Sequence, residues 1–212
     1  MTNERRLVYN EDHDFSIHED NMRPYTLYIN ACVRADSRTA HLAEKLLSKM
    51  DQPIDEVRVH EIPFPVADED FLIQRDGLIE EKDFDNPVFD LARQFAEAEN
   101  IVIAAPYWDL SFPAALKQYL EQINVVGITF RYTETGIPLG LCKAKKLYYV
   151  TTAGGGFAPD EYGFGYIEAL ARNYYGIQDL RLIKAVGLDI YGADVGEIMK
   201  AAEDEIIAMS VE

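Results

Sequence analysis

Two adjacent aromatic residues, Tyr107 and Trp108, stand in a short segment that neither a strand nor a helix explains. The segment extends from Pro106 to Leu110 and follows residues 101–105, an apolar and β-branched run typical of a strand buried on both faces. Aromatic rings beside backbone N–H groups are suited to binding a flat aromatic ligand. Packing in the core or at a dimer contact is the alternative, and it is commoner for aromatic residues in general.

A second segment offers groups for a phosphate. Residues 31–39 lead from an expected strand into an expected helix, and they contain hydroxyls at Ser37 and Thr39 and guanidinium groups at Arg34 and Arg38. Unpaired N–H groups at a helix start attract anions, and arginine pairs with phosphate oxygens. Ordinary capping of the helix explains the same hydroxyls equally well. The chain has no triphosphate-binding or Rossmann glycine motif after its first strand, so a mononucleotide phosphate fits better.

The third segment is rich in glycine. Thr152 and Ala153 precede Gly154, Gly155 and Gly156 at the end of another expected strand. Without Cβ atoms this backbone can approach a ligand closely, and a plain flexible turn is the alternative. Three loops that each offer donors to a different part of one ligand favour an isoalloxazine ring with a ribityl phosphate tail.

Strands and helices alternate along the chain, and this alternation must bring the three loops together. Strands are expected at 25–32, 56–62, 101–105, 146–152 and 182–190. Helices are expected at 37–50, 71–81, 87–99, 111–124, 160–175 and 194–209. Ser111 is expected to cap the fourth helix, with Pro113 in its first turn. Residues 126–141 are expected to form a hairpin or an ordered loop.

Five cycles of strand and helix predict an α/β fold in which helices cover both faces of a five-stranded parallel sheet. Right-handed crossovers make a flavodoxin-like three-layer sandwich with strand order 2-1-3-4-5 the leading topology. Ligands of such sheets bind outside the carboxyl ends of the strands, at the switch point between the first and third strands. Loops 31–39, 106–111 and 152–157 all belong to that edge.

The composition limits the class of partner. A length of 212 residues with 48% hydrophobic residues is enough for one core, and no apolar run approaches the ~20 residues of a membrane span. The net charge of −17 predicts no nucleic-acid partner and no anionic membrane partner. No apolar signal segment stands at the amino terminus, so a cytoplasmic location is expected.

The first residues are expected to form a leader or surface arm, 1–24, ahead of a single domain, 25–212. Its His13 and His18 lie among acidic residues. We expect these charged side chains to be solvated. No metal site is predicted, because the sequence implies no fixed ligand geometry.

Two further features are expected to be structural. Cys32 and Cys142 have no paired spacing, which favours buried reduced thiols. Residues 51–100 hold 15 acidic residues against 4 basic ones, which favours a solvated helical segment between strands.

The residues also resemble a known family. The segments that carry the resemblance are 105–113, Leu116-Lys117, 127–136 and 152–155. They look like the FMN-dependent NADH azoreductases, within the wider flavodoxin-like NAD(P)H:quinone oxidoreductases. The resemblance covers roughly residues 25–192, and Gly-x-Thr-Phe-Arg-Tyr-Thr-x-x-Gly at 127–136 is its most specific part.

This resemblance implies a homodimer with FMN near the interface. Hydride would pass from NADH or NADPH to FMN N5 and then to a quinone or azo acceptor, in a ping-pong reaction that needs no catalytic side chain. The positions carried over to the isoalloxazine are Pro106, Tyr107, Trp108, Asp109 and Leu110, and those carried over to its pyrimidine side are Thr152, Ala153, Gly154 and Gly155. Tyr132 and Phe157 are assigned to the substrate pocket.

Two positions depart from the family pattern. Asp109 stands where the family commonly has Asn, and an anionic group near the flavin is expected to disfavour its anionic reduced form. Cys32 stands where the family usually has Ser, so the phosphate is expected to rely more on Ser37, Arg38 and Thr39.

Two other functions remain open. A flavin-binding electron carrier without its own NAD(P)H turnover would use the acidic surface to dock a basic redox partner. An apo scaffold that keeps the fold but has lost FMN is the weaker alternative.

Overall fold

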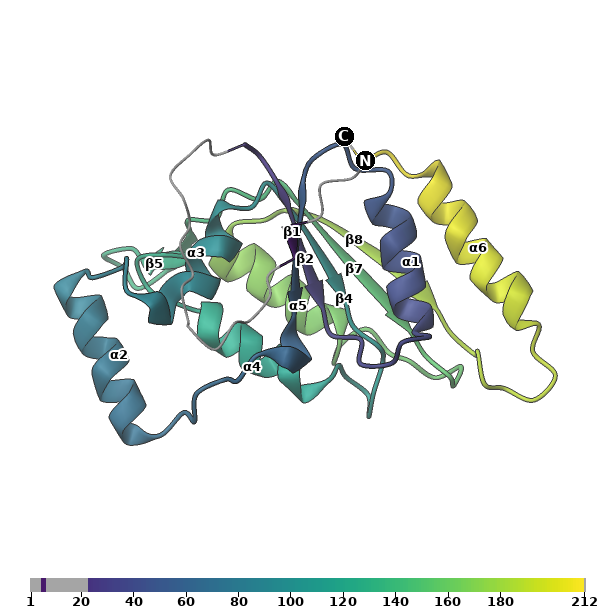
Figure 1. The fold of residues 1–212 in the computed structure, drawn as a ribbon, viewed down its shortest axis with the longest axis horizontal. Helices are drawn as coiled ribbons and strands as arrows, with labels where there is room; N and C mark the ends of the chain where they lie inside the picture. The colour runs from purple at the N-terminus through teal and green to yellow at the C-terminus, as the bar shows by residue number, and fades with distance from the viewer. Residues whose placement is uncertain (1–4, 7–22, 212) are drawn as a thin grey trace.

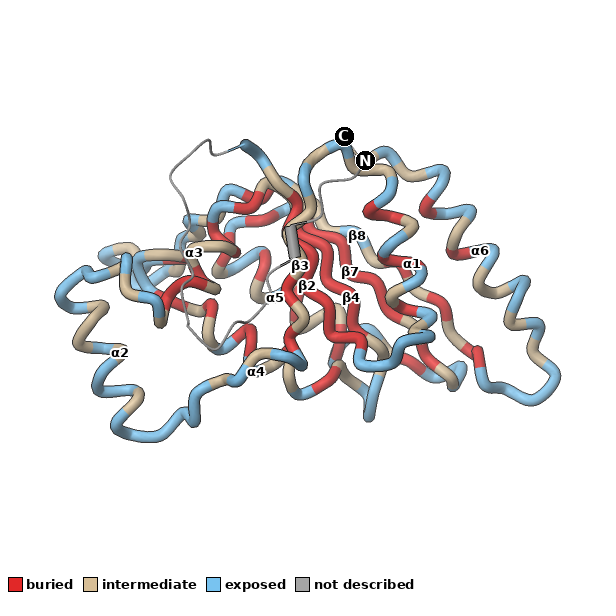
Figure 2. Tube along the Cα trace, in the orientation of Figure 1, coloured by how far each residue is buried: buried red, intermediate tan, exposed pale blue. Residues whose placement is uncertain are grey.

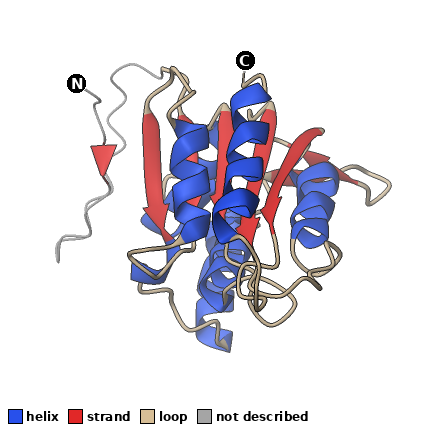
Figure 3. Ribbon diagram, turned by 90° about the vertical axis from the view of Figure 1, so that its right-hand side faces the viewer, coloured by secondary structure: helices blue, strands red, loops and turns tan. Residues whose placement is uncertain are grey.

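A parallel sheet forms the centre of the molecule (Figures 1 and 3). The computed structural model describes residues 5–6 and 23–211, so His13 and His18 lie outside the described residues. The strands of the sheet are β1 (Arg5–Arg6), β2 (Thr26–Asn30), β3 (Ile54–Arg58), β4 (Asn100–Ala104), β7 (Lys146–Thr152) and β8 (Asp179–Ala185). Their order is β1-β3-β2-β4-β7-β8.

The last five strands of that order confirm the predicted 2-1-3-4-5 topology. One addition comes from the segment expected to be a leader, because the two residues of β1 pair in parallel with Asp55 and Glu56 of β3. The sheet therefore has a sixth, very short strand at its edge.

Helices cover both faces of the sheet, as the alternation predicts (Figure 1). One face carries α1 (Arg38–Leu47) and α6 (Val195–Ala208). The other carries α3 (Asp90–Glu97), α4 (Ala114–Ile123) and α5 (Phe164–Leu170). The 3₁₀ turn η1 (Val59–Glu61) follows β3, and the 3₁₀ turn η2 (Pro87–Phe89) precedes α3. Helix α5 continues into a π-helical turn, η3 (Ala171–Tyr175).

Two hydrophobic cores hold these layers together, and the strands between them are buried (Figure 2). Leu42 and Leu46 of α1 and Ile206 of α6 are fully buried against one face. Phe95 of α3 and Tyr119 of α4 are fully buried against the other. Continuous apolar runs in β4 and β7 suit this position, because both faces of each strand are covered.

The expected hairpin is present and is bound closely to the domain. Its strands β5 (Phe130–Tyr132) and β6 (Pro138–Gly140) pair antiparallel. The Phe130 ring stacks on Tyr174 of η3 with ring centroids 4.4 Å apart. The backbones also meet, since a Cβ added to Gly140 would lie 2.2 Å from the Gly176 nitrogen.

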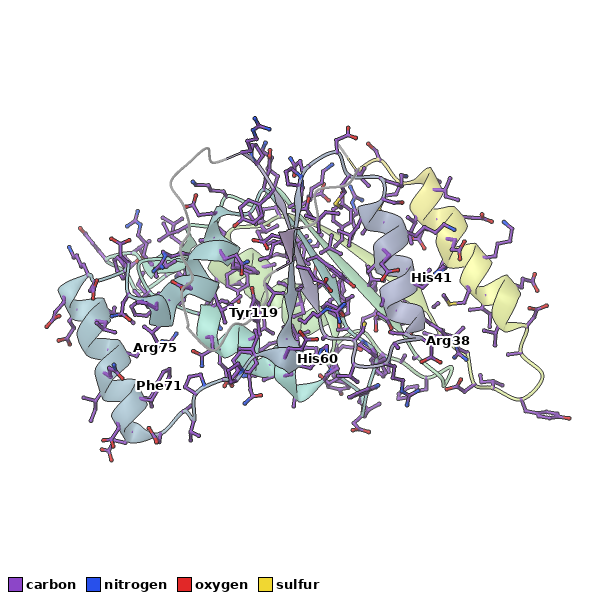
Figure 4. The ribbon with its side chains drawn as sticks, viewed as in Figure 1. Arg38, His41, His60, Phe71, Arg75 and Tyr119 are labelled. Atoms are coloured by element: carbon purple, nitrogen blue, oxygen red, sulfur yellow. The ribbon has the colours of Figure 1, made fainter. Side chains whose placement is uncertain are left out.

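The acidic segment forms α2 (Glu69–Glu81), which projects at the left of Figure 1 and buries none of its residues fully. Asp68 caps its first turn. Arg75, labelled in Figure 4, donates to the Asn124 carbonyl at 2.9 Å, just after the end of α4. A solvated helix in this region was predicted and is confirmed.

Some local predictions were wrong. The second strand is β3 at 54–58 rather than 56–62, because residues 59–61 form the 3₁₀ turn η1. The last strand is β8 at 179–185 rather than 182–190, because Leu188 and its neighbours form a turn that pairs with the glycine loop. Ser111 does not cap α4, since Pro113 holds the N-cap position and the Ser111 hydroxyl donates to the Tyr162 carbonyl at 2.6 Å.

Among residues 5–6 and 23–211, no helix is both long and apolar enough to cross a membrane.

Candidate functional site

The three loops singled out in the sequence meet at the carboxyl edge of the sheet, where the strand arrows end in Figure 3. The hydroxyls of Thr39 and Thr152 lie 2.7 Å apart and join the first turn of α1 to the end of β7. The Tyr107 N–H donates to the Thr152 carbonyl at 3.0 Å. Thr152 therefore connects all three loops, which places them around one region.

The loop between β2 and α1 is held open by side-chain bonds. Asn30, at the end of β2, accepts the Cys32 N–H at 2.9 Å and donates to Glu56 at 2.8 Å. Ser37 caps α1 by accepting the Ala40 N–H at 3.3 Å. The N–H groups of Arg38 and Thr39, at the start of α1, donate to no acceptor in the part of the chain that the structure describes, which makes them available to an anion.

Two residues of the phosphate loop, Thr39 and Cys32, are buried. Thr39 is 1% exposed and its hydroxyl already bonds Thr152, so only its backbone N–H is free to face a ligand. Cys32 is 5% exposed, and burial raises the pKa of its thiol to about 11. This thiol is neutral at physiological pH. The prediction of buried reduced thiols is confirmed for Cys32, while Cys142 is a half-buried free thiol.

The second loop contains a tight turn of unusual sequence. Trp108 and Ser111 exchange two backbone hydrogen bonds of 3.0 and 2.8 Å. Between them, Asp109 and Leu110 both have positive φ angles, 50° and 69°. Tight hairpin turns of this kind usually contain Asn-Gly, so a leucine in the second position is strained. The N–H groups of Asp109 and Leu110 donate to no acceptor in the described part of the chain.

The aromatic pair faces two environments. Trp108 is 40% exposed at the carboxyl edge of the sheet. The Tyr107 hydroxyl donates to the Pro159 carbonyl at 3.1 Å, and partial burial, with Asp160 nearby, raises the pKa of Tyr107. Tyr107 thus positions the loop, while the Trp108 ring is the one left open to a ligand.

The glycine loop is shaped by a partner that the sequence did not reveal, the turn after β8. Its Leu188 and Asp189 N–H groups donate to the carbonyls of Ala153 and Gly154, at 3.2 and 2.9 Å. The N–H groups of Gly154, Gly155 and Gly156 donate to no acceptor among the described residues. This side of the site therefore presents a short row of unpaired donors, as in other anion-binding backbone segments.

The two residues assigned to a substrate pocket lie in different places. Phe157 follows the glycines and is 78% exposed. Tyr132 lies on the hairpin, which packs against η3. Because α5 runs from the carboxyl edge toward the opposite edge before β8 begins, η3 and the hairpin lie away from the three loops. One copy of the chain therefore does not bring Tyr132 to the site.

A groove of about 440 Å³ borders the phosphate loop. It lies between α1 and α6 and is lined by Ser37, Arg38, His41, Met199 and Glu203, among others. None of the residues that line it belongs to the loops around Trp108 and the glycines. We therefore place the candidate site at the three loops and not in this groove.

The residues present fit a flavin mononucleotide. The unpaired N–H groups of the two loops around Asp109 and Gly154 suit the polar edge of an isoalloxazine, and the open Trp108 ring suits its face. The first turn of α1 with Arg34 and Arg38 suits a phosphate. Among the described residues, no group of three or more His, Cys, Asp or Glu residues could hold a metal ion.

The chain is similar to known proteins over most of its length. Residues 25–209 match the family model of the flavodoxin-like fold. The chain is 36% identical to an FMN-dependent NADH:quinone oxidoreductase of Clostridium beijerinckii, over 84% of this chain and 94% of that protein. It is 33% identical to one of Clostridium perfringens, over 87% and 96%. The crystal structure of an FMN-dependent NADH-azoreductase from Bacillus anthracis in complex with FMN superposes with a TM-score of 0.72 at 25% identity, over 87% and 96%.

Proposed function

Because the chain belongs to the flavodoxin-like family of FMN-dependent NADH:quinone oxidoreductases, we propose that it is an FMN-dependent oxidoreductase that reduces quinone or azo compounds with NADH or NADPH. The observation that carries the proposal is the meeting of three loops with unpaired N–H groups around the exposed Trp108 ring. When bound, FMN would supply the redox chemistry that links NAD(P)H to the acceptor, and a ping-pong sequence is proposed for it.

The residues of the chain bind and orient the cofactor. The N–H groups of the first turn of α1 bind the phosphate, with Arg34 and Arg38 as charge partners. Trp108 packs on the ring. The N–H groups of Asp109 and Leu110 and of the glycine loop hydrogen-bond the polar edge of the ring. No side chain acts as a nucleophile, which agrees with the protonated, buried state of Cys32.

The chain acts as a homodimer with FMN near the interface. Tyr132 supports this part of the proposal, because the residue is 49% exposed on a hairpin that lies away from the three loops of its own copy. A second copy would supply Tyr132 to the substrate pocket beside Phe157. We also infer that the protein acts in the cytoplasm on small molecules. Sedimentation of the purified protein tests the dimer, and Tyr132→Ala should change the KM for quinone more than FMN content.

Flavin content and turnover test the function. The purified protein should show the absorption bands of FMN or regain them on reconstitution, and should oxidise NADH or NADPH with menadione or methyl red. A protein that binds no FMN contradicts the proposal. Flavin that is reduced by a reductase but not by NADH or NADPH would instead identify an electron carrier, the function that the acidic surface would suit.

A further inference from the structure

An ion pair crosses the phosphate side of the candidate site. The Arg38 guanidinium Nη1 lies 2.9 Å from the Asp189 carboxylate Oδ1, although 151 residues separate them. Arg38 is the first residue of α1 and is marked at the lower end of that helix in Figure 4. Asp189 belongs to the turn after β8. The side chains are 43% and 70% exposed, so a ligand can reach both.

The position of Asp189 is fixed by the glycine loop. Its N–H donates to the Gly154 carbonyl at 2.9 Å. Its second carboxylate oxygen lies so close to this glycine that a Cβ at Gly154 would be 2.2 Å away from it. Asp189 therefore places a negative charge between the glycine loop and the first turn of α1, next to the expected path of the ribityl phosphate tail.

Few cations are available to that phosphate. Arg34 and Arg38 are the basic residues of the loop between β2 and the first turn of α1, and the whole chain carries a net charge of −17. Arg34 forms no ion pair with any residue that the structure describes. The engagement of Arg38 by Asp189 thus occupies one of the two guanidinium groups.

We propose that Asp189 competes with the FMN phosphate for Arg38 and so sets how strongly the chain prefers FMN to a flavin without a phosphate. This inference rests on the proposed function. A carboxylate at this position acts as an internal anion on Arg38, and it also repels a phosphate dianion nearby. Because the pair is exposed, the effect is moderate, and removal of the carboxylate charge is expected to strengthen FMN binding about twofold to fivefold.

The experiment compares two flavins on the flavin-free protein. Quenching of flavin fluorescence gives the Kd for FMN and for riboflavin, in low-salt buffer, for the native chain and for Asp189→Asn. We expect Asp189→Asn to lower the Kd for FMN by about twofold to fivefold and to leave that for riboflavin unchanged. The gain in FMN affinity should shrink in about 0.5 M salt, because the Debye length then falls to a few ångströms and exposed charges are screened.

Two further variants separate competition from other causes. Asp204→Asn removes one negative charge from an outward pair with Lys200 on α6 and should change neither Kd. In an Arg38→Met background, Asp189→Asn should strengthen FMN binding less than it does in the native chain, because the shared cation is gone. Thermal unfolding without flavin confirms that each variant is folded.

The outcomes distinguish this inference from the function on which it rests. A native chain that binds neither flavin contradicts the proposed function itself. A native chain that binds FMN, with equal changes for both flavins in Asp189→Asn, leaves the function intact and overturns the competition. Weaker FMN binding in Asp189→Asn also overturns it, because the carboxylate would then hold Arg38 in place for the phosphate.

Discussion

The hydroxyl oxygens of Thr39 and Thr152 lie 2.7 Å apart and join two loops that are 113 residues apart in the chain. Thr39→Val keeps the shape of the side chain but removes this bond and leaves the other hydroxyl unpaired in a mostly buried position. We expect a loss of about 1–2 kcal/mol in the free energy of unfolding and weaker FMN binding. Urea denaturation and flavin titration measure the two effects.

Two variants check that interpretation. Thr135→Val removes a hydroxyl from an exposed pair with Thr133 and should cost less than about 0.5 kcal/mol. The double variant Thr39→Val/Thr152→Val should cost less than the sum of the single variants, since both members of one bond are removed together. Strict additivity would show that the two hydroxyls do not depend on each other.

Asp109 is the position where the chain departs from its family nearest to the proposed flavin. Asp109→Asn removes a negative charge that opposes the anionic reduced cofactor. If the Asp109 charge destabilises the anionic reduced flavin by about 1 kcal/mol, its removal should raise the two-electron reduction potential by about 20 mV. Equilibration with a reference dye during reduction measures the potential, and Asp204→Asn on α6 should leave it unchanged. An equal or lower potential in Asp109→Asn would show that the side chain does not act on the flavin.

The strain at Leu110 can be tested by the order of stability of its variants. Asn tolerates a φ of 69° better than Leu, and a β-branched residue tolerates it less. We therefore expect Leu110→Asn to unfold at the same or higher urea concentration as the native chain, and Leu110→Val to lose about 1 kcal/mol. The reverse order would mean that the leucine side chain contributes more through packing than the turn loses through strain.

Lys49, which follows the end of α1, binds the end of α6. Its ammonium group donates to the carbonyls of Ile206, Ile207 and Met209 at 2.7, 2.8 and 2.6 Å, at the end of α6. Lys49→Met keeps the aliphatic stem and should lower the free energy of unfolding by about 1–3 kcal/mol, because hydrogen bonds to a charged group are lost. Lys200→Met, which breaks an exposed pair on α6, should cost about 0.5 kcal/mol or less.

Burial of the two thiols predicts a loss of stability in alkaline solution. Burial raises the pKa of Cys32 from 9.0 to about 11 and that of Cys142 to about 12. The unfolded chain therefore loses thiol protons first, and the free energy of unfolding should fall from pH 9 to about pH 11 by up to about 1.4 kcal/mol per pH unit for each thiol. Urea denaturation at several pH values measures the slope, which should be smaller in Cys32→Ala.

The order of the elements was predictable because each is encoded locally. The apolar run at 146–152 coincides with β7, and the turn residues at 135 and 136 correctly indicated a hairpin. The topology followed from right-handed crossovers, and it placed the three loops at one edge before any contact was known. The last strand was misplaced because Leu188 is apolar but belongs to a turn that the glycine loop stabilises.

The contacts that complete the site were not predictable from spacing. Asn30 shapes the phosphate loop through bonds to Cys32 and Glu56, and its polar side chain at the end of a buried strand was the available signal. Asp189 gave no signal, because its role depends on Arg38 in a segment 151 residues away. The position of Tyr132, away from the loops of its own copy, likewise depends on how the hairpin packs against η3.

The close approach of the Gly140 and Gly176 backbones has a consequence for how the protein opens. Because no side chain separates them, the hairpin cannot lift from the π-helical turn without exposing the Phe130 and Tyr174 rings together. The hairpin and the end of α5 should therefore exchange their amide hydrogens as one cooperative unit, more slowly than the solvated helix α2, which buries none of its residues fully.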